Sequence, residues 1–287
     1  FPPLSTTPLE ELKPPRPGQY VVLKFGGSSL KDPERLSVSL DTITMEHSQL
    51  QRTGSQLPEM SEGNNTDSDS GDSGDSSGDS GNAIKPSHLA VVVCAMGNST
   101  DLLIDAATLA SNGDIDRAYE LVEQIAEMCH TNVAVAGKVP ECVTSLLDAL
   151  RQLLLGMSLV REMTPAMLDS ILSFGERLSA LTVRELLEHR GISAIFVDAR
   201  DWLITDASFG KAKVDRDATC KQLLWARQQW GDAVAVVTGF IGRTRDDRTT
   251  TLGRNGSDYT AAILGAALKA DRVIINTDVT GIMTADP

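Results

Sequence analysis

The sequence predicts an α/β fold in which a mostly parallel central sheet is sandwiched between helices. Short apolar runs of strand length alternate with longer runs whose apolar residues recur every three or four positions, the spacing of a helix. The runs at 20–25 and 89–94 each end in a glycine-bearing turn that leads into a helical run. Continuous apolar strands of this kind are typical of a parallel sheet covered on both faces, with ligands at the carboxyl ends of its strands.

The first part of the chain is predicted to contain one strand, one helix and two irregular segments. Residues 1–18 hold six prolines and little hydrophobic periodicity, so we predict a flexible leader there and one domain over 19–287. A strand at 20–25 and a helix at 33–46 follow. Residues 51–85 repeat Gly, Asp and Ser with almost no large apolar side chain. Because such a segment cannot bury enough surface to offset its ordering entropy, it is predicted to be a disordered insertion.

The second part repeats the order of strand, glycine turn and helix. After the strand at 89–94 comes a polar turn at 97–100 and a helix from Asp101. Helical spacing then continues over 114–155. Thr164 and Pro165 start another helix that reaches about residue 188, because Thr suits the N-cap and Pro the first helical position. The remaining predicted elements are strands at 193–197, 233–239 and 272–277, and helices at 218–229 and 259–269.

Composition argues against several classes of partner. The formal charge of −13 disfavours nucleic acid, because phosphate backbones are bound by clustered Lys and Arg. No apolar run reaches the roughly 18 residues of a membrane-spanning helix, and the N-terminus lacks a secretory pattern. The cysteines are scattered, without C-x-x-C spacing, so neither a zinc site nor a disulfide framework is predicted. We expect a reducing compartment, the cytoplasm, or a plastid if the source is photosynthetic.

The stretch at 249–259 is the strongest candidate for a ligand-binding loop. Gly253 and Gly256 flank Arg254, whose planar guanidinium suits a carboxylate or phosphate. Ser257 and Asp258 stand where the next helix is expected to begin, a position that favours anions. Taken alone, the loop is equally compatible with a hydrophilic connection whose Ser and Asp only cap the helix.

Three glycine-bearing turns follow predicted strands and fall on one edge of the sheet, at 24–29, 94–100 and 239–242. None has the P-loop pattern or a G-x-G-x-x-G that opens a helix, so the common nucleotide fingerprints are absent. Lys24, followed by Gly26 and Gly27, still offers a cation beside backbone N–H groups, a combination that suits a transferring phosphoryl group. The alternative is a strand-end lysine that only extends into solvent.

Five separated motifs stand out along the chain: Lys24-Phe25-Gly26-Gly27-Ser28-Ser29, Phe174-Gly175-Glu176, Gly239-Phe240-Ile241-Gly242, the loop at 249–258, and Thr277-Asp278-Val279-Thr280-Gly281. In order and spacing they resemble the motifs of aspartate kinases, which belong to the amino acid kinase family, and the resemblance covers about 21–287 apart from the insertion. Related kinases for glutamate, acetylglutamate or UMP share the lysine-glycine start but lack the loop at 249–258 as a set.

The resemblance implies a role for each matching residue. Lys24 would bridge the phosphates as a catalytic residue, and Asp258 would organise Lys24 and the reacting groups. Arg254 would bind the α-carboxylate of aspartate, and Glu176 its α-amino group. The substrate pocket would be completed by Thr100, Phe240 and Ser257. The residues implied in ATP binding are Lys24, Phe25, Gly26, Gly27, Thr277, Asp278 and Met283.

The implied reaction is transfer of the γ-phosphoryl group of ATP to the side-chain carboxylate of L-aspartate, giving 4-phospho-L-aspartate. This is the first step towards Lys, Thr, Met and Ile. The implied cofactors are ATP and Mg²⁺, the ion bound through the nucleotide phosphates and not by a metal site of the protein. Two alternatives are a non-catalytic module that binds aspartate or a nucleotide, and a sister kinase for another carboxylate. Lys24 and Asp258 together favour the enzyme, because a binding module needs no phosphate lysine with its organising aspartate.

The sequence departs from the usual aspartate kinase pattern at three positions. Cys94 stands where serine is common, which replaces a good hydroxyl donor with a weak one. Met283 stands where tyrosine is frequent, and Thr280 where aspartate is frequent. The differences at Cys94 and Met283 affect details of the phosphate and adenine contacts, whereas Thr280 is interpreted as neutral because it lies in a turn. The implied reaction is unchanged.

The end of the chain carries a further expectation. The enzymes it resembles continue past this point with segments that close the nucleotide cleft and then with regulatory ACT domains. We therefore expect a kinase domain that is truncated at its C-terminal end, binds ATP poorly by itself and belongs to a homo-oligomer in the full-length protein. The sequence leaves open a fusion to homoserine dehydrogenase and the identity of an inhibitory amino acid.

Overall fold

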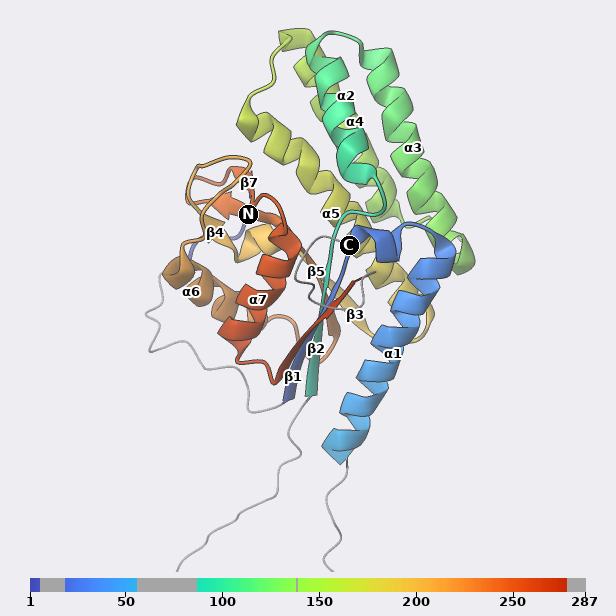
Figure 1. The fold of residues 1–287 in the computed structure, drawn as a ribbon, viewed down its shortest axis with the longest axis vertical. Coiled ribbons are helices and arrows are strands. Elements are labelled where there is room, and N and C mark those ends of the chain that lie inside the picture. Colours follow the sequence, from blue (N-terminus) through green and yellow to red (C-terminus); the bar gives the residue numbers. More distant parts are fainter. Residues whose placement is uncertain (6–18, 56–86, 138, 278–287) are drawn as a thin grey trace, which may run out of the picture.

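The computed structural model describes residues 1–5, 19–55, 87–137 and 139–277 (Figure 1). Its main sheet has five strands in the order β3-β5-β2-β1-β8, and every neighbouring pair is parallel. The predicted α/β fold with a mostly parallel sheet is therefore confirmed. The strands are β1 (Gln19–Phe25), β2 (Ser87–Val93), β3 (Ala194–Val197), β5 (Val234–Thr238) and β8 (Arg272–Asn276).

Helices cover both faces of this sheet because its side chains alternate between two apolar cores. Val21 and Leu23 of β1 belong to a core shared with α1 to α5, whereas Tyr20 and Val22 belong to a core shared with α6 and α7. In Figure 1, α6 and α7 lie on one side of the strands and α1 on the other. The helices are α1 (Pro33–Ser55), α2 (Ser99–Ser111), α3 (Ile115–Val133), α4 (Glu141–Val160), α5 (Pro165–His189), α6 (Arg216–Arg227) and α7 (Gly256–Leu268).

The helices differ in length from their predictions. α1 continues to Ser55, so the first five residues assigned to the insertion, 51–55, are helical; the rest of that segment lies outside the described residues. The extension is consistent with packing, because Leu50 is buried in the larger core. The helical spacing predicted over 114–155 corresponds to two helices, α3 and α4, which are separated by a short 3₁₀ turn and by Pro140 at the N-cap of α4.

The start of the chain also differs from the prediction of a flexible leader. The Phe1 ring lies over the guanidinium groups of Arg200 and Arg243, at 5.0 and 5.2 Å. Arg243 donates to the Pro2 carbonyl at 2.8 Å, and the Ser5 N–H donates to Gln222 at 2.7 Å. Residues 1–5 are therefore held against the domain, whereas residues 6–18 lie outside the described part.

A second, three-stranded sheet was not predicted. Its order is β4-β6-β7, with β4 (Ile204–Thr205), β6 (Ile241–Thr244) and β7 (Thr249–Thr251). β6 and β7 form an antiparallel hairpin, and β4 runs parallel to β6. This small sheet sets the direction of the two segments that enter the candidate site, because Phe240 precedes β6 and Arg254 follows β7.

Among the described helices, only α4 is long and apolar enough to cross a membrane by length and composition. Its buried residues belong to the larger apolar core, where α4 contacts α2, α3 and α5. A core helix of a folded domain meets the same criteria, so α4 is accounted for by its packing. The residues of α4 that belong to this core are Val143, Leu146, Leu147, Leu150, Leu154 and Met157.

β1 occupies an interior position in the sheet although it is the first of the described strands. Its neighbours are β2 on one side and β8, the last described strand, on the other. At the start of the β1–β8 pairing, the Tyr20 N–H donates a hydrogen bond to the Asp271 carboxylate at 2.8 Å. β8 itself is an edge strand among the described residues, and Val273 and Ile275 on it are exposed.

Candidate active site

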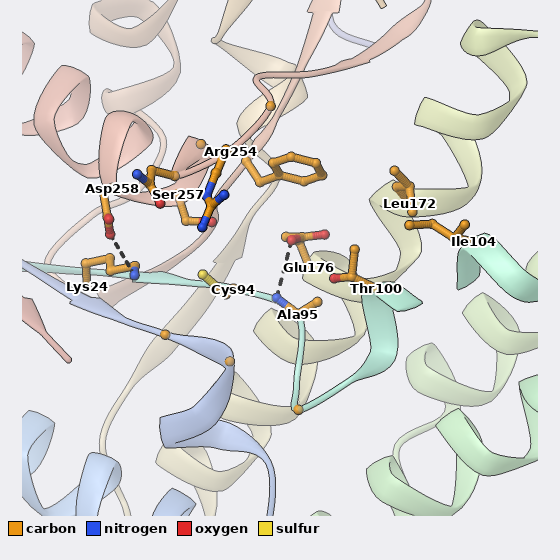
Figure 2. Close-up of a pocket in the computed structure, with 17 residues that line it drawn as sticks. Lys24, Cys94, Ala95, Thr100, Ile104, Leu172, Glu176, Arg254, Ser257 and Asp258 are labelled. Atoms are coloured by element: carbon orange, nitrogen blue, oxygen red, sulfur yellow. Dashed lines mark hydrogen bonds and ion pairs between the residues drawn. The ribbon is translucent and has the colours of Figure 1, made fainter. Parts of the chain in front are cut away.

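A pocket of about 510 Å³ opens at the carboxyl ends of β1 and β2. The turns after β1, β2 and β5 meet there with the segment that leads into α7, as the sequence predicts for a parallel sheet. Figure 2 shows Lys24 and Asp258 at one end of the pocket, Ile104 and Leu172 at the other, and Glu176 and Thr100 between them. The pocket is lined by Lys24, Gly26, Gly27, Cys94, Ala95, Gly97, Thr100, Ile104, Leu172, Glu176, Phe240, Gly253, Arg254, Asn255, Gly256, Ser257 and Asp258.

The turns after β1 and β2 are held together by their backbones. The Gly97 N–H donates to the Gly27 carbonyl at 3.0 Å, and the Cys94 N–H donates to the Phe25 carbonyl at 3.2 Å. A Cβ at Gly27 would lie 2.5 Å from the Ala95 carbonyl oxygen, closer than real contacts allow. Glycine is therefore required at this position by the approach of the neighbouring backbone, besides any contact with a ligand.

Lys24 and Asp258 form an ion pair with 2.6 Å between Nζ and Oδ1. Lys24 belongs to β1, and its side chain is nearly buried. Asp258 lies in the first turn of α7 and is more exposed. The alternative of a lysine that only extends into solvent is therefore excluded, since Nζ lies inside the pocket wall against a carboxylate. A fixed ammonium in this position can neutralise charge on a phosphate.

Glu176 is buried on α5 with only 4% of its surface exposed. Its Oε1 accepts a 3.3 Å hydrogen bond from the Ala95 N–H, while Oε2 has no hydrogen-bond partner among the described residues. Burial raises the pKa of Glu176 to about 8. A buried carboxylate with an unsatisfied oxygen in a pocket wall is suited to bind a cationic group of a ligand.

Arg254 lies opposite these groups, on the segment between β7 and α7. Two left-handed residues shape this segment, Gly253 with φ 78° and Asn255 with φ 59°. Figure 2 shows the guanidinium of Arg254 extending towards the centre of the pocket. Arg254 is exposed and has no salt bridge among the described residues, so its donors are available to an anionic group.

Two helices begin at the pocket without a side-chain cap. Asn98 at the N-cap of α2 and Asn255 at the N-cap of α7 accept no capping hydrogen bond, whereas Thr164 and Asp215 cap α5 and α6. α7 begins at Gly256, so Ser257 and Asp258 lie within its first turn and do not act as its cap. Uncapped N–H groups and the helix dipole both favour an anionic ligand here.

Phe240 is held in a left-handed conformation with φ 66°, which is rare for a bulky residue. Its N–H donates to Thr260 Oγ1 at 3.1 Å, and its carbonyl accepts from the Leu252 N–H at 2.9 Å. A Cβ at Gly256 would lie 2.8 Å from the Phe240 ring. These contacts from α7 and its preceding segment fix the Phe240 ring at the pocket wall. A strained backbone conformation persists only where the surrounding structure holds it, as these contacts do here.

Cys94 lines the pocket between Lys24 and Ala95. Burial raises the pKa of the Cys94 thiol, although the nearby Lys24 charge and a hydrogen bond with Ser257 act in the opposite direction. The thiol is therefore the neutral, weak donor that replaces the serine hydroxyl noted in the sequence.

The residues implied in ATP binding fall into three groups. Lys24, Gly26 and Gly27 line the pocket. The Phe25 side chain is buried in the apolar core and does not line the pocket, because it points to the opposite side of β1 from Lys24. Thr277 follows β8 at the same edge of the sheet, outside the pocket lining, and the predicted contacts of Asp278 and Met283 lie outside the described residues.

Several lining residues were not predicted as part of the site. Ile104 on α2 and Leu172 on α5 form an apolar end of the pocket, beyond Glu176 (Figure 2). In the sequence they are indistinguishable from residues of an amphipathic helix that face the core. Asn255 carries the one available signal, since Asn beside Gly tolerates the left-handed conformation that it adopts here.

The fold and the pocket define an α/β protein whose pocket, at the carboxyl edge of a parallel sheet, is lined by groups suited to anions and by a carboxyl group suited to a cation. The chain belongs to the amino acid kinase family, whose sequence model matches residues 77–287. The match begins after β1 and α1. These elements are covered by alignments with individual relatives that extend over as much as 94% of this chain.

Several relatives are aspartokinases. The chain is 34% identical over 198 residues to lysine-sensitive aspartokinase 3 of Escherichia coli (strain K12), covering 69% of this chain and 44% of that protein. It is 30% identical over 279 residues to aspartokinase 1, chloroplastic, of Arabidopsis thaliana, covering 94% and 42%. The crystal structure of E. coli aspartokinase III in complex with aspartate and ADP has a TM-score of 0.72 and 29% identity, covering 94% and 51%. The chain thus spans about half the length of these relatives.

Proposed function

We propose that this chain is the substrate-binding part of an aspartate kinase, which transfers the γ-phosphoryl group of ATP to the side-chain carboxylate of L-aspartate. The observation that carries the proposal is the gathering of Glu176, Arg254 and the Lys24–Asp258 ion pair in one pocket. An amino acid with an acidic side chain needs an anion for its ammonium, a cation for its α-carboxylate and a free second carboxylate. The pocket offers the first two beside a lysine suited to phosphate.

The proposed reaction needs no general base from the protein. The side-chain carboxylate of aspartate is already ionised at neutral pH, so one of its oxygens attacks the γ-phosphorus directly. The bond from that phosphorus to the bridging oxygen breaks, and its electron pair leaves with ADP. The protein contributes position and electrostatics: Glu176 and Arg254 orient the amino acid, and Lys24 offsets charge on the transferring group.

Asp258 has a supporting role in this scheme. Its carboxylate holds Lys24 Nζ at 2.6 Å and so keeps the ammonium at the carboxyl end of β1. Because Asp258 belongs to the first turn of α7, the ion pair also fixes the N-terminus of α7 relative to the turn after β1. Phosphate-binding groups from two distant parts of the chain are thereby aligned before a ligand enters.

We infer that Mg²⁺ would be bound through the phosphates of the nucleotide. Within the described residues, no three His, Cys, Asp or Glu side chains come together to hold a metal. Mg²⁺ commonly keeps several waters and binds phosphate oxygens with few protein ligands. When bound, it neutralises phosphate charge during transfer.

The relatives support this assignment and extend it to the whole protein. Relatives from bacteria, a yeast and plants are aspartokinases. We infer that the full-length protein catalyses the first step towards aspartate-derived amino acids, as a homo-oligomer with regulatory ACT domains. Its location would be the cytoplasm, or a plastid in a photosynthetic source, given the chloroplastic relatives.

Activity and binding measurements distinguish the proposed aspartate kinase from the two alternatives, a sister kinase and a non-catalytic module. ATP-dependent formation of aspartyl hydroxamate from the full-length protein is expected with L-aspartate and not with L-glutamate or N-acetylglutamate. Activity with glutamate or acetylglutamate alone would assign a sister kinase. Binding of aspartate or ATP by calorimetry without any turnover would assign a non-catalytic module.

A further inference from the structure

Asp169 is a buried carboxylate that lies outside the pocket lining. It belongs to α5, and only 1% of its surface is exposed. Its Oδ2 accepts from the backbone N–H groups of Gly210 and Thr251, each at 2.9 Å. Its Oδ1 accepts from the Thr251 hydroxyl at 2.8 Å and also lies 3.1 Å from the Gly210 nitrogen. Burial raises the pKa of Asp169, while these donors favour its ionised form.

The two segments that Asp169 holds converge on the residue before Arg254. Thr251 ends β7 and stands two positions before Gly253. Gly210 belongs to the loop between β4 and α6, and its carbonyl would lie 3.1 Å from a Cβ built at Gly253. The Ala212 N–H donates to the Thr251 carbonyl at 2.9 Å. Gly253, with φ 78°, is thus clamped between the loop and the end of β7.

α5 also carries Glu176, seven residues after Asp169. Seven residues are two helical turns, or about 10 Å along the axis, and place both carboxylates on one face of α5. Leu172, between them on the same face, lines the pocket. α5 therefore positions two parts of the pocket. It carries Glu176 directly, and it holds the segment that contains Arg254 through the hydrogen bonds of Asp169.

We propose that Asp169 is a positioning residue that sets the Arg254 segment at the correct distance from Glu176. This inference rests on the proposed function, in which these two residues bind the opposite charges of the amino acid. The side-chain hydrogen bonds of Asp169 go to Gly210, in the 206–213 loop, and to Thr251, at the end of β7, and neither residue lines the pocket. Loss of its hydrogen bonds is expected to loosen the grip on the amino acid and to leave the Lys24–Asp258 pair unaffected.

The test measures steady-state kinetics of the full-length protein with Asp169→Asn. The amide keeps the size of the side chain but turns one acceptor into a donor that faces N–H groups. The KM for aspartate is expected to rise by about tenfold, while the KM for ATP stays within about twofold.

Asp206→Asn is the matched control. Asp206 accepts three hydrogen bonds, from the Ser208 N–H and hydroxyl and from the Lys213 N–H, so it shapes the same loop. Asp206 is exposed, and these side-chain hydrogen bonds stay within the loop and do not reach α5. The KM of the Asp206→Asn variant for aspartate is expected to stay within about threefold of the parent value. A role of Asp169 in loop structure alone would give both variants the same effect on both substrates and would overturn the inference.

A second pair of variants decides the matter if Asp169→Asn does not fold. Thr251→Val removes the hydroxyl that donates to Asp169 and keeps the backbone, whereas Thr251→Ser keeps the hydroxyl. The KM for aspartate is expected to rise severalfold in the first and to match the parent in the second. Equal aspartate KM values for Thr251→Val and Thr251→Ser, or an unchanged value for a folded Asp169→Asn, would overturn the positioning role. A parent that cannot phosphorylate aspartate would overturn the proposed function and this inference with it.

Discussion

At the scale of single residues, Glu176 has the most direct link between burial and chemistry. Its pKa of about 8 means that the empty pocket holds a mostly neutral carboxyl group at pH 7. Glu176 must ionise to bind an ammonium group, and the free energy that this ionisation costs weakens the observed binding. Affinity for aspartate should therefore depend on pH in a range where the substrate's own charges are constant.

The first prediction concerns this dependence. The Kd for aspartate, measured by calorimetry, is expected to fall by more than about tenfold between pH 6 and pH 8, because the ionised fraction of Glu176 rises over that range. Glu176→Gln is expected to bind weakly and to lose the dependence. A parent whose Kd is constant over this range would contradict a buried, neutral Glu176.

Stability of the ligand-free protein gives an independent check of the same group. The folded-state pKa of Glu176 lies above its ordinary value of 4.5, so the folded protein holds a proton that the unfolded chain releases. The free energy of unfolding should therefore decrease as pH rises from about 5 to about 8, relative to Glu176→Gln.

The second prediction concerns Lys24. Lys24→Ala is expected to lower kcat by on the order of a hundredfold or more, because it removes a charge that acts on the transferring group. Thermal melting of the variant should show a folded protein, since the Lys24 ammonium lies in the pocket and its neighbours on β1 form the core. Turnover close to that of the parent would contradict the assignment of Lys24.

The charged residues of the site could be predicted from the sequence, whereas its apolar wall could not. Lys24, Glu176 and Arg254 belong to separate motifs that together resemble those of aspartate kinases, although each residue alone is also compatible with a structural role. Ile104 and Leu172 contribute only shape, and an apolar residue on a helix gives no local signal of whether it faces a core or a pocket. The conformation of Phe240 also depends on contacts with α7, twenty residues away in sequence.

At the scale of elements, the close approach of α5 to the turn after β2 determines where Glu176 lies. A Cβ at Gly175 would lie 2.8 Å from Ala95 Cβ and 3.3 Å from Leu103 Cδ1. Glycine lets the helix come near enough for the Ala95 N–H to donate to Glu176. A larger residue would force the helix and the turn apart.

The third prediction compares two glycines in helices. Gly156 on α4 has nothing within 4 Å of a built Cβ, so Gly156→Ala should stabilise the protein by up to about 1 kcal/mol through helix propensity. Gly175→Ala gains the same propensity but overpacks, so it should be less stable than Gly156→Ala by about 1–3 kcal/mol. Urea unfolding measures both, and equal shifts would show that α5 and the turn separate freely.

The parallel sheet could be predicted from the sequence, but the small sheet could not, for a physical reason. β1, β2 and β5 are apolar runs buried on both faces, which is a strong pattern. β4 and β7 have two and three residues, too few for any periodicity. The small sheet has one local feature of a hairpin: Ile241–Thr244 and Thr249–Thr251 flank a short turn in which Asp247 has φ 63°.

At the scale of the whole molecule, the apolar cores are built from residues on both sides of the predicted insertion. Leu40, Ile43 and Leu50 of α1 pack in the same core as Leu89 and Val91 of β2. The sequence between them contributes Gly, Asp and Ser and almost no large apolar side chain. The stability of the domain should therefore be independent of that sequence.

The fourth prediction tests this independence. Replacing residues 56–85 with a Gly/Ser linker is expected to change the melting temperature by no more than about 3 °C. The matched control removes 47–85 and so deletes the buried Leu50, which should cost about 2–5 kcal/mol. Equal losses in the two deletions would show that the 56–85 sequence supports the fold.

The interior position of β1 has a consequence for biosynthesis. Tyr20 and its partner Asp271 are 251 residues apart, and ribosomes add about 5–20 residues per second. At that rate, β8, the second neighbour of β1, is translated on the order of 10–50 s after β1. During this interval the nascent chain exposes an unpaired strand edge, which can pair with other chains, and the Lys24 ammonium lacks the Asp258 carboxylate. Lys24 is therefore made well before Asp258, the carboxylate that holds it in the folded domain.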